Sequence, residues 1–298
     1  MVKKISYYIA LYFSRRWGLW FFRAFSWFIA TGYYFLFPRR VAHSHKFYRA
    51  LIPGKKRLYY LRCAWRQYHN FTNVYVHRFV RLSEDEIEFT KEGWQYLEEA
   101  VKKKTGAVVV MSHVGNWELA AQMLKRKGMP IMLYLGAKAK HKEQVESIQK
   151  RKLAARGIKI VTTSEEEKSP FALLEGINFL RDGGIVFMSG DRLWGNQSSV
   201  LVNFLGYEAK IPDTPHLLAL VTGAPLMTFF VYEKDFGKYH VKVSAGRSVR
   251  ALSRAARKKT VYESAQRYAD ELIDFVRAHP FEWHHFDPFL GKKIEKES

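Results

Sequence analysis

Short apolar runs alternate with helical patterns through the second part of the chain. The run Ala107–Met111 is apolar and β-branched, and a helical pattern follows it through Leu119, Met123 and Leu124. Further strands are predicted at 130–135, 158–162, 185–189, 200–205, 226–232 and 239–244, and further helices at 141–156, 170–181, 214–222 and 260–278. Strands that alternate with helices of this length predict an α/β fold, a mixed sheet covered by helices.

The N-terminal region has a different pattern. Residues 17–37 are apolar and aromatic with one charge, Arg23, and a helix of this length can cross a bilayer core. At 100° per residue the helix also gathers polar side chains into a wedge of about 120°, which is typical of a helix lying in the headgroup layer. That polar stripe consists of Lys4, Arg15, Arg16, Arg23 and Ser26. The sequence therefore predicts an anchor helix over residues 1–37 that either spans the membrane or lies in its interface.

Three further regions follow the anchor. Residues 38–104 mix Arg, Lys and aromatic residues without the alternation of strands, which predicts basic helices at the membrane. Residues 105–291 form the predicted α/β core, and 292–298 a disordered tail. If the anchor spans, the positive charges after it, among them Arg39 and Arg40, place the rest of the chain on the cytoplasmic side.

The amino-acid composition indicates which classes of binding partner are expected but does not identify one partner. The 298 residues contain 49 Lys and Arg against 28 Asp and Glu, a net charge of +21, so a polyanionic partner is expected. An aromatic fraction of 16% favours a membrane interface. The single cysteine, Cys63, excludes an internal disulfide and a four-cysteine zinc site.

The candidate catalytic residues lie where the first predicted buried strand ends. His113 follows the strand, Gly115 permits a tight turn, and Glu118 lies in the helix that comes next. Side chains five residues apart point about 140° apart on a continuous helix, so His113 must precede the helix for Glu118 to turn back to it. A histidine as general base with a carboxylate to orient it is what a hydroxyl nucleophile needs. The same spacing occurs at His141 and Glu146, in a lysine-rich run typical of a solvated helix face.

Three blocks in order carry a family resemblance. They are His113–Glu118, Gly183–Arg192, and Val202–Pro215 with the helical segment after it. With them the sequence resembles the bacterial lipid A biosynthesis (lauroyl/myristoyl) acyltransferases, as a divergent member of the larger His-x4-[Asp/Glu] acyltransferase group. The arginine usual after the second strand is missing, and Lys138 stands as its substitute.

The resemblance implies an O-acyltransferase on the cytoplasmic face of a bacterial inner membrane. A fatty acyl chain would pass from acyl carrier protein or coenzyme A to a hydroxyl of a lipid acceptor, a lipid A precursor or a related glycolipid, with no metal or redox cofactor. In this scheme His113 is the base and Glu118 orients it, while backbone N–H groups at the start of the Asn116 helix hold the oxyanion. The substrate-binding candidates are Asn116, Trp117, Lys138, Asp191 and Arg192.

Two other functional classes stay open at this point. One is a membrane-tethered basic domain that binds a polyanion without turnover, although no nucleic-acid-binding signature is visible. The other is an α/β hydrolase, but its Gly-x-Ser-x-Gly elbow is missing. The segment Trp283–Phe286, with His279, suggests packing or headgroup contacts more than a metal site.

Overall fold

The computed structural model describes residues 16–74, 87–136, 153–155, 157–163, 170–193 and 197–295. Its helices are α2 (Leu19–Leu36), α3 (Pro38–Leu51), α4 (Arg57–Asn73), α6 (Trp94–Lys102), α7 (Trp117–Arg126), α9 (Pro170–Arg181), α10 (Thr214–Thr222) and α11 (Arg257–Ala278). Its strands are β1 (Glu88–Glu92), β2 (Ala107–Met111), β3 (Ile131–Gly136), β4 (Lys159–Thr163), β5 (Ile185–Ser189), β6 (Ser199–Phe204), β7 (Tyr207–Pro212), β8 (Leu226–Asp235), β9 (Lys238–Val243) and β10 (Leu290–Lys293).

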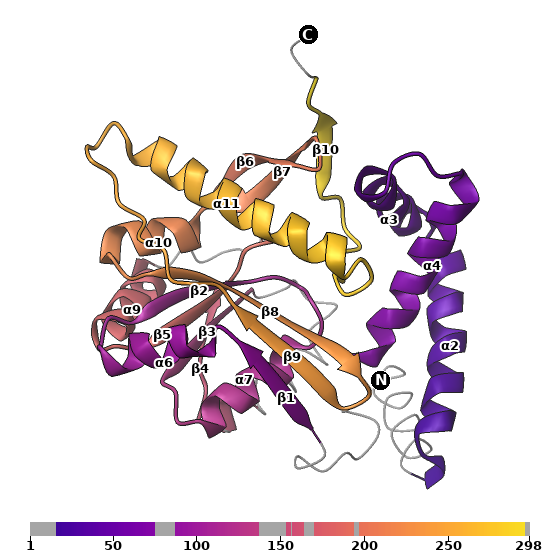
Figure 1. The fold of residues 1–298 in the computed structure, drawn as a ribbon, viewed down its shortest axis with the longest axis horizontal. Coiled ribbons are helices and arrows are strands. Elements are labelled where there is room, and N and C mark those ends of the chain that lie inside the picture. Colours follow the sequence, from indigo (N-terminus) through magenta and orange to yellow (C-terminus); the bar gives the residue numbers. More distant parts are fainter. Residues whose placement is uncertain are drawn as a thin grey trace.

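A seven-stranded mixed sheet forms the centre of the fold. Its strand order is β1-β9-β8-β2-β5-β3-β4, in which β2 is parallel to both β5 and β8 while β9 is antiparallel to β8. A second, three-stranded sheet has the order β10-β7-β6, and α11 packs across β6. Helices α2, α3 and α4 lie together beside these layers (Figure 1). The predicted α/β fold with a mixed, helix-covered sheet is confirmed.

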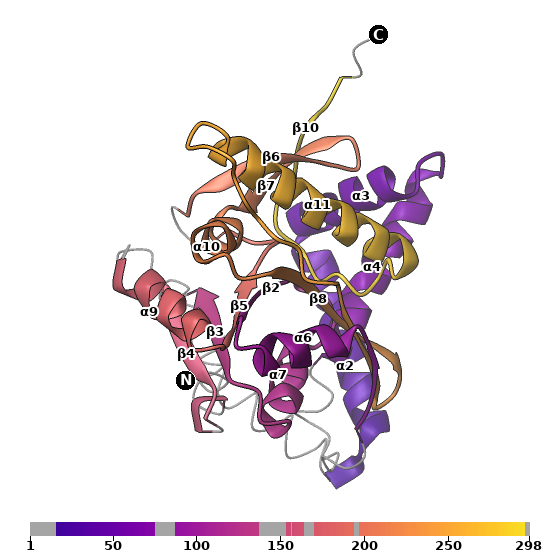
Figure 2. The same ribbon diagram turned by 60° about the vertical axis from the view of Figure 1, so that its left-hand side comes forward.

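Alternate residues of the central strands face two separate cores. In β2, Val108 and Val110 pack in the cluster that contains α10 and α11, whereas Val109 and Met111 pack in the cluster that contains α6 and α7. Figure 2 shows these helix pairs on opposite faces of the sheet. Both faces of β2 are therefore buried, which explains why its sequence is an unbroken apolar run.

Most elements lie where the hydrophobic pattern predicts them. The strands predicted between 107 and 244 correspond to β2, β3, β4, β5, β6, β8 and β9, and the helices predicted at 170–181, 214–222 and 260–278 correspond to α9, α10 and α11. The helix predicted at 141–156 lies outside the described residues except for 153–155, which are helical.

Three strands were not predicted from the sequence: β1, β7 and β10. Every residue of β1 and β10 is exposed or half-exposed, so neither strand shows an apolar pattern. Because β1 pairs with β9, the prediction that 38–104 contains no strand is wrong for Glu88–Glu92. The predicted disordered tail is wrong for Lys292 and Lys293, which belong to β10.

Helix α2 packs against α4 through one face only. Phe22, Ser26 and Ala30 are buried on that face. Trp20 and Phe28, by contrast, are 67% and 70% exposed. Within the part of the chain that the structure describes, no helix is both long enough and apolar enough to cross a membrane. The interfacial alternative for this helix stays a prediction.

Candidate active site

Two neighbouring parallel strands bring His113 and Asp191 together. In the β2–β5 pair, Met111 lies opposite Ser189. Each strand ends there, and His113 and Asp191 both follow two residues later. The register therefore places the two side chains at one sheet edge, where His113 Nδ1 lies 2.8 Å from Asp191 Oδ1.

The Asp191 carboxylate is buried and fully engaged. Besides His113 Nδ1, the backbone N–H of His113 and the indole Nε1 of Trp283 donate to it, each at 2.8 Å, and Ser189 Oγ donates at 3.2 Å. Burial alone would raise the pKa of Asp191, but the charge and hydrogen bond of His113, with Arg192, outweigh it and hold that pKa well below its usual range. Asp191 is therefore an anion whose negative charge is directed at His113.

This arrangement fixes the tautomer of the neutral imidazole. An ionised carboxylate can only accept hydrogen bonds, so Nδ1 is the nitrogen of His113 that donates to Asp191, and Nε2 is the nitrogen that can exchange a proton with a substrate. The His113 side chain is 25% exposed, whereas that of Asp191 has no exposed surface. A half-open imidazole with a buried anion behind it is the geometry of a general base that can act on an entering hydroxyl.

A C-terminal segment holds the turn after His113 in place. The backbone N–H of His284 donates to the carbonyl of His113 at 2.8 Å, and that of Gly115 donates to the carbonyl of Glu282 at 3.0 Å. Gly115 has φ +52°, and a Cβ there would collide with the carbonyl of Val231, so this turn requires glycine. The side chain of Gln67 in α4 donates to the carbonyl of Trp283, which ties the same segment to the helical layer.

The other predicted site residues that the structure describes have contacts of their own. Asn116 caps α7 by accepting from the Leu119 N–H, and its amide nitrogen donates to the Val74 carbonyl. Trp117 packs on a hydrophobic core. Arg192 is half-buried with its Nη2 4.0 Å from Asp287 Oδ2. Glu118 lies in the first turn of α7, but its side chain and the whole of Lys138 lie outside the described part of the chain.

The structure shows a contact of Asp191 that the sequence did not predict. Asp191, expected to bind the acceptor, bonds to the imidazole that Glu118 was expected to orient. Trp283, interpreted from the sequence as packing or headgroup contact, is a hydrogen-bond donor to Asp191. The only sequence signal for Trp283 was its position between an acidic residue and two histidines.

A second carboxyl group, Glu282, is buried beside the turn. Burial raises its pKa to about 7, and the neighbouring Glu233 carboxylate adds to the rise, while a hydrogen bond from Asn70 works against both. In the unfolded chain the ordinary value is 4.5. The folded state therefore favours the neutral form, so this group costs no stability below pH 4.5, destabilises the fold progressively as the pH rises from 4.5 to about 7, and has a constant cost at higher pH.

We expect Glu282→Gln to stabilise the protein in alkaline buffer only. The amide keeps the size and the hydrogen-bond acceptor but cannot ionise, so at pH 8 the free energy of unfolding should rise by up to about 3 kcal/mol, and at pH 4.5 it should hardly change. Denaturant unfolding followed by tryptophan fluorescence at the two pH values measures this difference. An equal effect at both would show that Glu282 ionises normally in the fold.

Comparison with known proteins identifies the family of this chain. The family model for bacterial lipid A biosynthesis acyltransferases matches residues 71–290, which include His113, Asp191 and Trp283. A phosphatidylinositol mannoside acyltransferase of Mycobacterium tuberculosis H37Rv is 23% identical over 231 residues, covering 75% of this chain and 66% of that protein. One from Mycolicibacterium smegmatis is 24% identical over 200 residues, covering 65% and 59%. The chain thus spans less than two thirds of these relatives. The matched region contains the whole strand-edge site, and the chain belongs to the bacterial lipid A biosynthesis acyltransferase family.

Proposed function

We propose that this protein transfers a fatty acyl chain from an acyl thioester to a hydroxyl group of a membrane glycolipid. The observation that carries the proposal is the buried Asp191 carboxylate bonded to Nδ1 of the part-exposed His113. A histidine held this way can deprotonate a hydroxyl, and acyl transfer is the chemistry that the family name describes.

The reaction follows from the dyad. His113 Nε2 takes the proton of the acceptor hydroxyl as its oxygen attacks the thioester carbonyl, and Asp191 stabilises the imidazolium that forms. The tetrahedral intermediate collapses, the carbon–sulfur bond breaks, and the imidazolium returns the proton to the leaving thiolate. The products are an ester and a free thiol. Asp191 acts through His113 and is a positioning residue.

Other predicted roles are kept as part of the proposal. The backbone N–H groups of His113 and Gly115 already donate to Asp191 and Glu282, so the oxyanion would be left to the first turn of α7. Glu118 lies in that turn and is proposed to bind a reacting group beside His113. Arg192, Asn116, Trp117 and Lys138 remain candidates for substrate contacts.

The charge of the chain and the names of its relatives support a choice of donor and acceptor. Acyl carrier proteins are acidic and coenzyme A carries phosphates, so either donor suits a chain of net charge +21. The relatives are named for acylating a phosphatidylinositol mannoside, a glycolipid. The family description names lipid A, which is also a glycolipid. A glycolipid acceptor is what both descriptions share.

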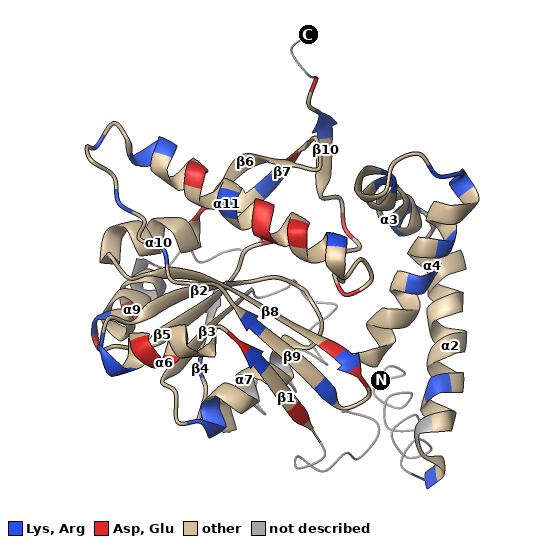
Figure 3. Ribbon diagram, in the orientation of Figure 1, with Lys and Arg blue, Asp and Glu red and all other residues tan. Residues whose placement is uncertain are grey.

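We also propose that the protein works on the cytoplasmic face of a bacterial inner membrane. Helix α2 turns Trp20, Phe28 and Phe35 outward, while its Ser26 faces the protein. Helices α2, α3 and α4 carry Lys and Arg but no Asp or Glu (Figure 3). An apolar aromatic face next to an exclusively basic region suits the interface of an anionic bilayer.

A double substitution, Trp20→Ser with Phe28→Ser, should reduce binding to phosphatidylglycerol vesicles by about 100-fold or more, because each buried aromatic side chain contributes roughly 1.5 to 3 kcal/mol. Vesicle flotation measures the bound fraction. Leu252→Ser is the matched control, since Leu252 is fully exposed (102%) in the connection between β9 and α11. Unchanged flotation of the double variant would move the membrane contact to α3 and α4.

The polyanion-binding alternative does not account for the buried carboxylate of the site. A binding domain without turnover has no need to bury a carboxylate and devote its four hydrogen bonds to one imidazole and its surroundings. Such burial is costly and is concentrated at functional sites. The Asp191–His113 pair therefore favours an enzyme.

The direct test uses the full chain with vesicles that contain a bacterial glycolipid extract. Radiolabelled acyl coenzyme A and acyl carrier protein are supplied separately, and the lipids are separated and analysed by mass spectrometry. We expect an alkali-labile acylated glycolipid and one free thiol for each ester formed. Thiol release without lipid acylation would indicate a thioesterase, and failure with both donors and all acceptors would overturn the proposal.

A further inference from the structure

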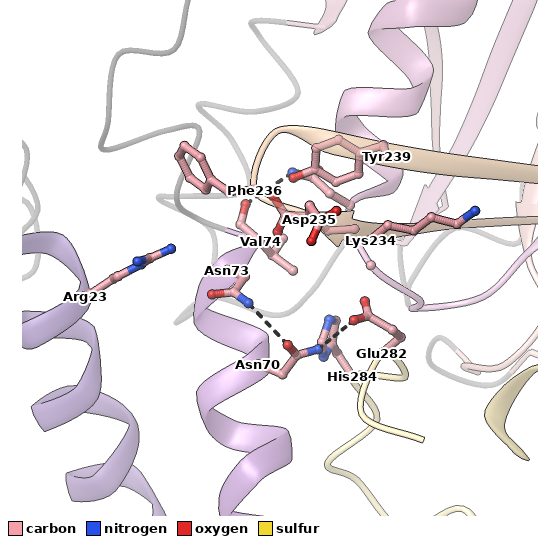
Figure 4. Close-up of a pocket in the computed structure, with 13 residues that line it drawn as sticks. Arg23, Asn70, Asn73, Val74, Lys234, Asp235, Phe236, Tyr239, Glu282 and His284 are labelled. Atoms are coloured by element: carbon pink, nitrogen blue, oxygen red, sulfur yellow. Dashed lines mark hydrogen bonds between the residues drawn. The ribbon is translucent and has the colours of Figure 1, made fainter. Parts of the chain in front are cut away.

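A cavity of about 300 Å³ lies against the turn that follows His113. Its walls come from the end of α4, the β8–β9 hairpin, the turn itself and the C-terminal segment around Glu282 (Figure 4). Among the residues that the structure describes, those lining the cavity are Arg23, Asn70, Asn73, Val74, Gly115, Asn116, Glu233, Lys234, Asp235, Phe236, Tyr239, Glu282 and His284. This volume is at the lower end of small-molecule sites and suits a group about the size of one sugar ring.

The inner wall is polar, and the residues that the structure describes there include no cation. Its buried residues are Asn116, Tyr239 and His284, and Glu282 and Asn70 are half-buried beside them. Burial lowers the pKa of His284 to about 3, so this imidazole is neutral. Asn70 donates to both the Glu282 carboxyl and the Phe281 carbonyl, which holds the two side chains at the wall. The wall therefore offers carboxyl, amide, phenol and neutral imidazole groups.

The imidazole of His284 has hydrogen-bonding capacity that no described residue uses. Its side chain is only slightly exposed, and its Nδ1 has no hydrogen-bond partner among the residues that the structure describes. A buried polar atom without a partner costs free energy unless a ligand or water satisfies it. An unpartnered buried nitrogen in the lining of a polar cavity indicates a hydrogen-bonding occupant.

The cations of the cavity lie at its rim. Arg23 and Lys234 are both exposed. In Figure 4, Arg23 reaches in from α2, and the Lys234 side chain extends away from Asn73 and Val74. An anionic group deep in the cavity would meet the Glu282 and Glu233 carboxyl groups, and none of the described residues of the inner wall is a cation that could compensate it. An alkyl chain would leave the polar wall without partners.

The cavity is also coupled to the catalytic turn. Gly115 and Asn116 line it two and three residues after His113, and the backbone N–H of His284 bonds to the His113 carbonyl at 2.8 Å. An occupant of the cavity is therefore held by the same segment that fixes the position of the base.

From these contacts we propose that the cavity binds an uncharged, polyhydroxylated ring, the carbohydrate part of the acceptor, with Glu282, Asn70 and His284 hydrogen-bonding its hydroxyl groups. The inference rests on the proposed function and adds to it a location and a preference for neutral over phosphorylated sugar rings. A carboxyl or amide group can hydrogen-bond to two neighbouring hydroxyl groups of a ring at once.

Ligand-observed saturation-transfer NMR on the full chain in a detergent without sugar groups tests this proposal. The neutral probes are methyl α-mannopyranoside, methyl α-glucopyranoside and myo-inositol, and the charged probes are mannose 6-phosphate and glucose 6-phosphate. We expect at least one neutral probe to bind at least tenfold more tightly than its phosphorylated counterpart. Failure of all neutral probes to bind, or equal binding of the phosphates, would overturn the proposal.

Two variants locate the binding. Glu282→Leu removes the carboxyl group from the wall, and Asn73→Trp fills the cavity from an exposed position at the end of α4, so it does not depend on changes in the core. Each should weaken binding of the neutral probe at least tenfold. Glu263→Gln, on an exposed face of α11, is the matched control and should bind normally. Unchanged binding in both cavity variants would exclude this cavity as the sugar site.

The sugar site and the acyl-transfer reaction can fail separately. His113→Asn should bind the neutral probe as the natural protein does while lacking transfer. Sugar binding that depends on Glu282 in a protein without any transfer activity would refute the reaction and leave the site standing. Acyl transfer to a glycolipid with unaffected kinetics in Asn73→Trp would refute the site and leave the reaction standing.

Discussion

Replacing His113 with asparagine should abolish acyl transfer without unfolding the protein. The amide nitrogen of asparagine takes the position of Nδ1 and can keep the bond to Asp191, but nothing replaces Nε2. General-base assistance contributes roughly 10²- to 10⁴-fold to the rate. Without it, a neutral hydroxyl reacts only slowly with the thioester. We therefore expect kcat to fall by at least about 10³-fold while vesicle binding and thermal unfolding stay near those of the natural protein.

Two companion variants sharpen this test. His113→Ala should be equally inactive but less stable, because it leaves the buried Asp191 anion without its charge partner. His141→Ala, at the second match to the same spacing, should keep full activity. Transfer by His113→Asn at more than a few per cent of the natural rate would end the general-base assignment.

The second large effect is expected from Asp191→Asn. Donors approach both carboxylate oxygens, with His113 Nδ1 and Ser189 Oγ on one and the His113 N–H and Trp283 Nε1 on the other. An asparagine amide group must turn its own N–H toward one of these pairs, so the imidazole loses either its charge partner alone or its fixed tautomer as well. We expect kcat to fall by about 10²- to 10⁴-fold with little change in the KM for either substrate.

Glu118→Gln is the control that separates the two carboxylates. Both variants are assayed below their measured unfolding temperatures, and kcat is followed across pH. If Asp191 is the carboxylate that orients His113, only Asp191→Asn should distort the pH profile of kcat, and Glu118→Gln should have the smaller effect on turnover. A larger loss in Glu118→Gln, with both proteins folded, would return the orienting role to Glu118 as the spacing in the sequence suggested.

The hydrophobic pattern predicts the buried part of this fold because apolar residues occupy the buried positions of strands and helices. Strand β2 is buried on both faces and β5 nearly so, and their apolar runs are visible in the sequence without any partner. In β1, whose pattern is polar, the strand exists because β9 offers a free edge to pair with. That pairing is a tertiary effect, which no local pattern contains.

The same distinction applies to the site. His113 could be identified locally, because a histidine, a glycine and a helix start follow one another after a buried strand. The partnership with Asp191 could not, because 78 residues separate the two and only the alignment of β2 with β5 brings them together. Trp283 is further still, 92 residues beyond Asp191. Local spacing therefore favoured Glu118, the nearest carboxylate along the chain.

The alignment of Met111 with Ser189 also determines where the chain can tolerate insertions and deletions. One residue gained or lost between Met111 and His113, or between Ser189 and Asp191, would move a side chain by about 3.3 Å and turn it toward the opposite side of the backbone. The long stretch between β2 and β5 is under no such constraint, because its length does not enter the geometry of the pair. Related proteins can thus differ freely in the number of residues between the histidine and its acid, provided that each keeps its two-residue distance from the end of its strand.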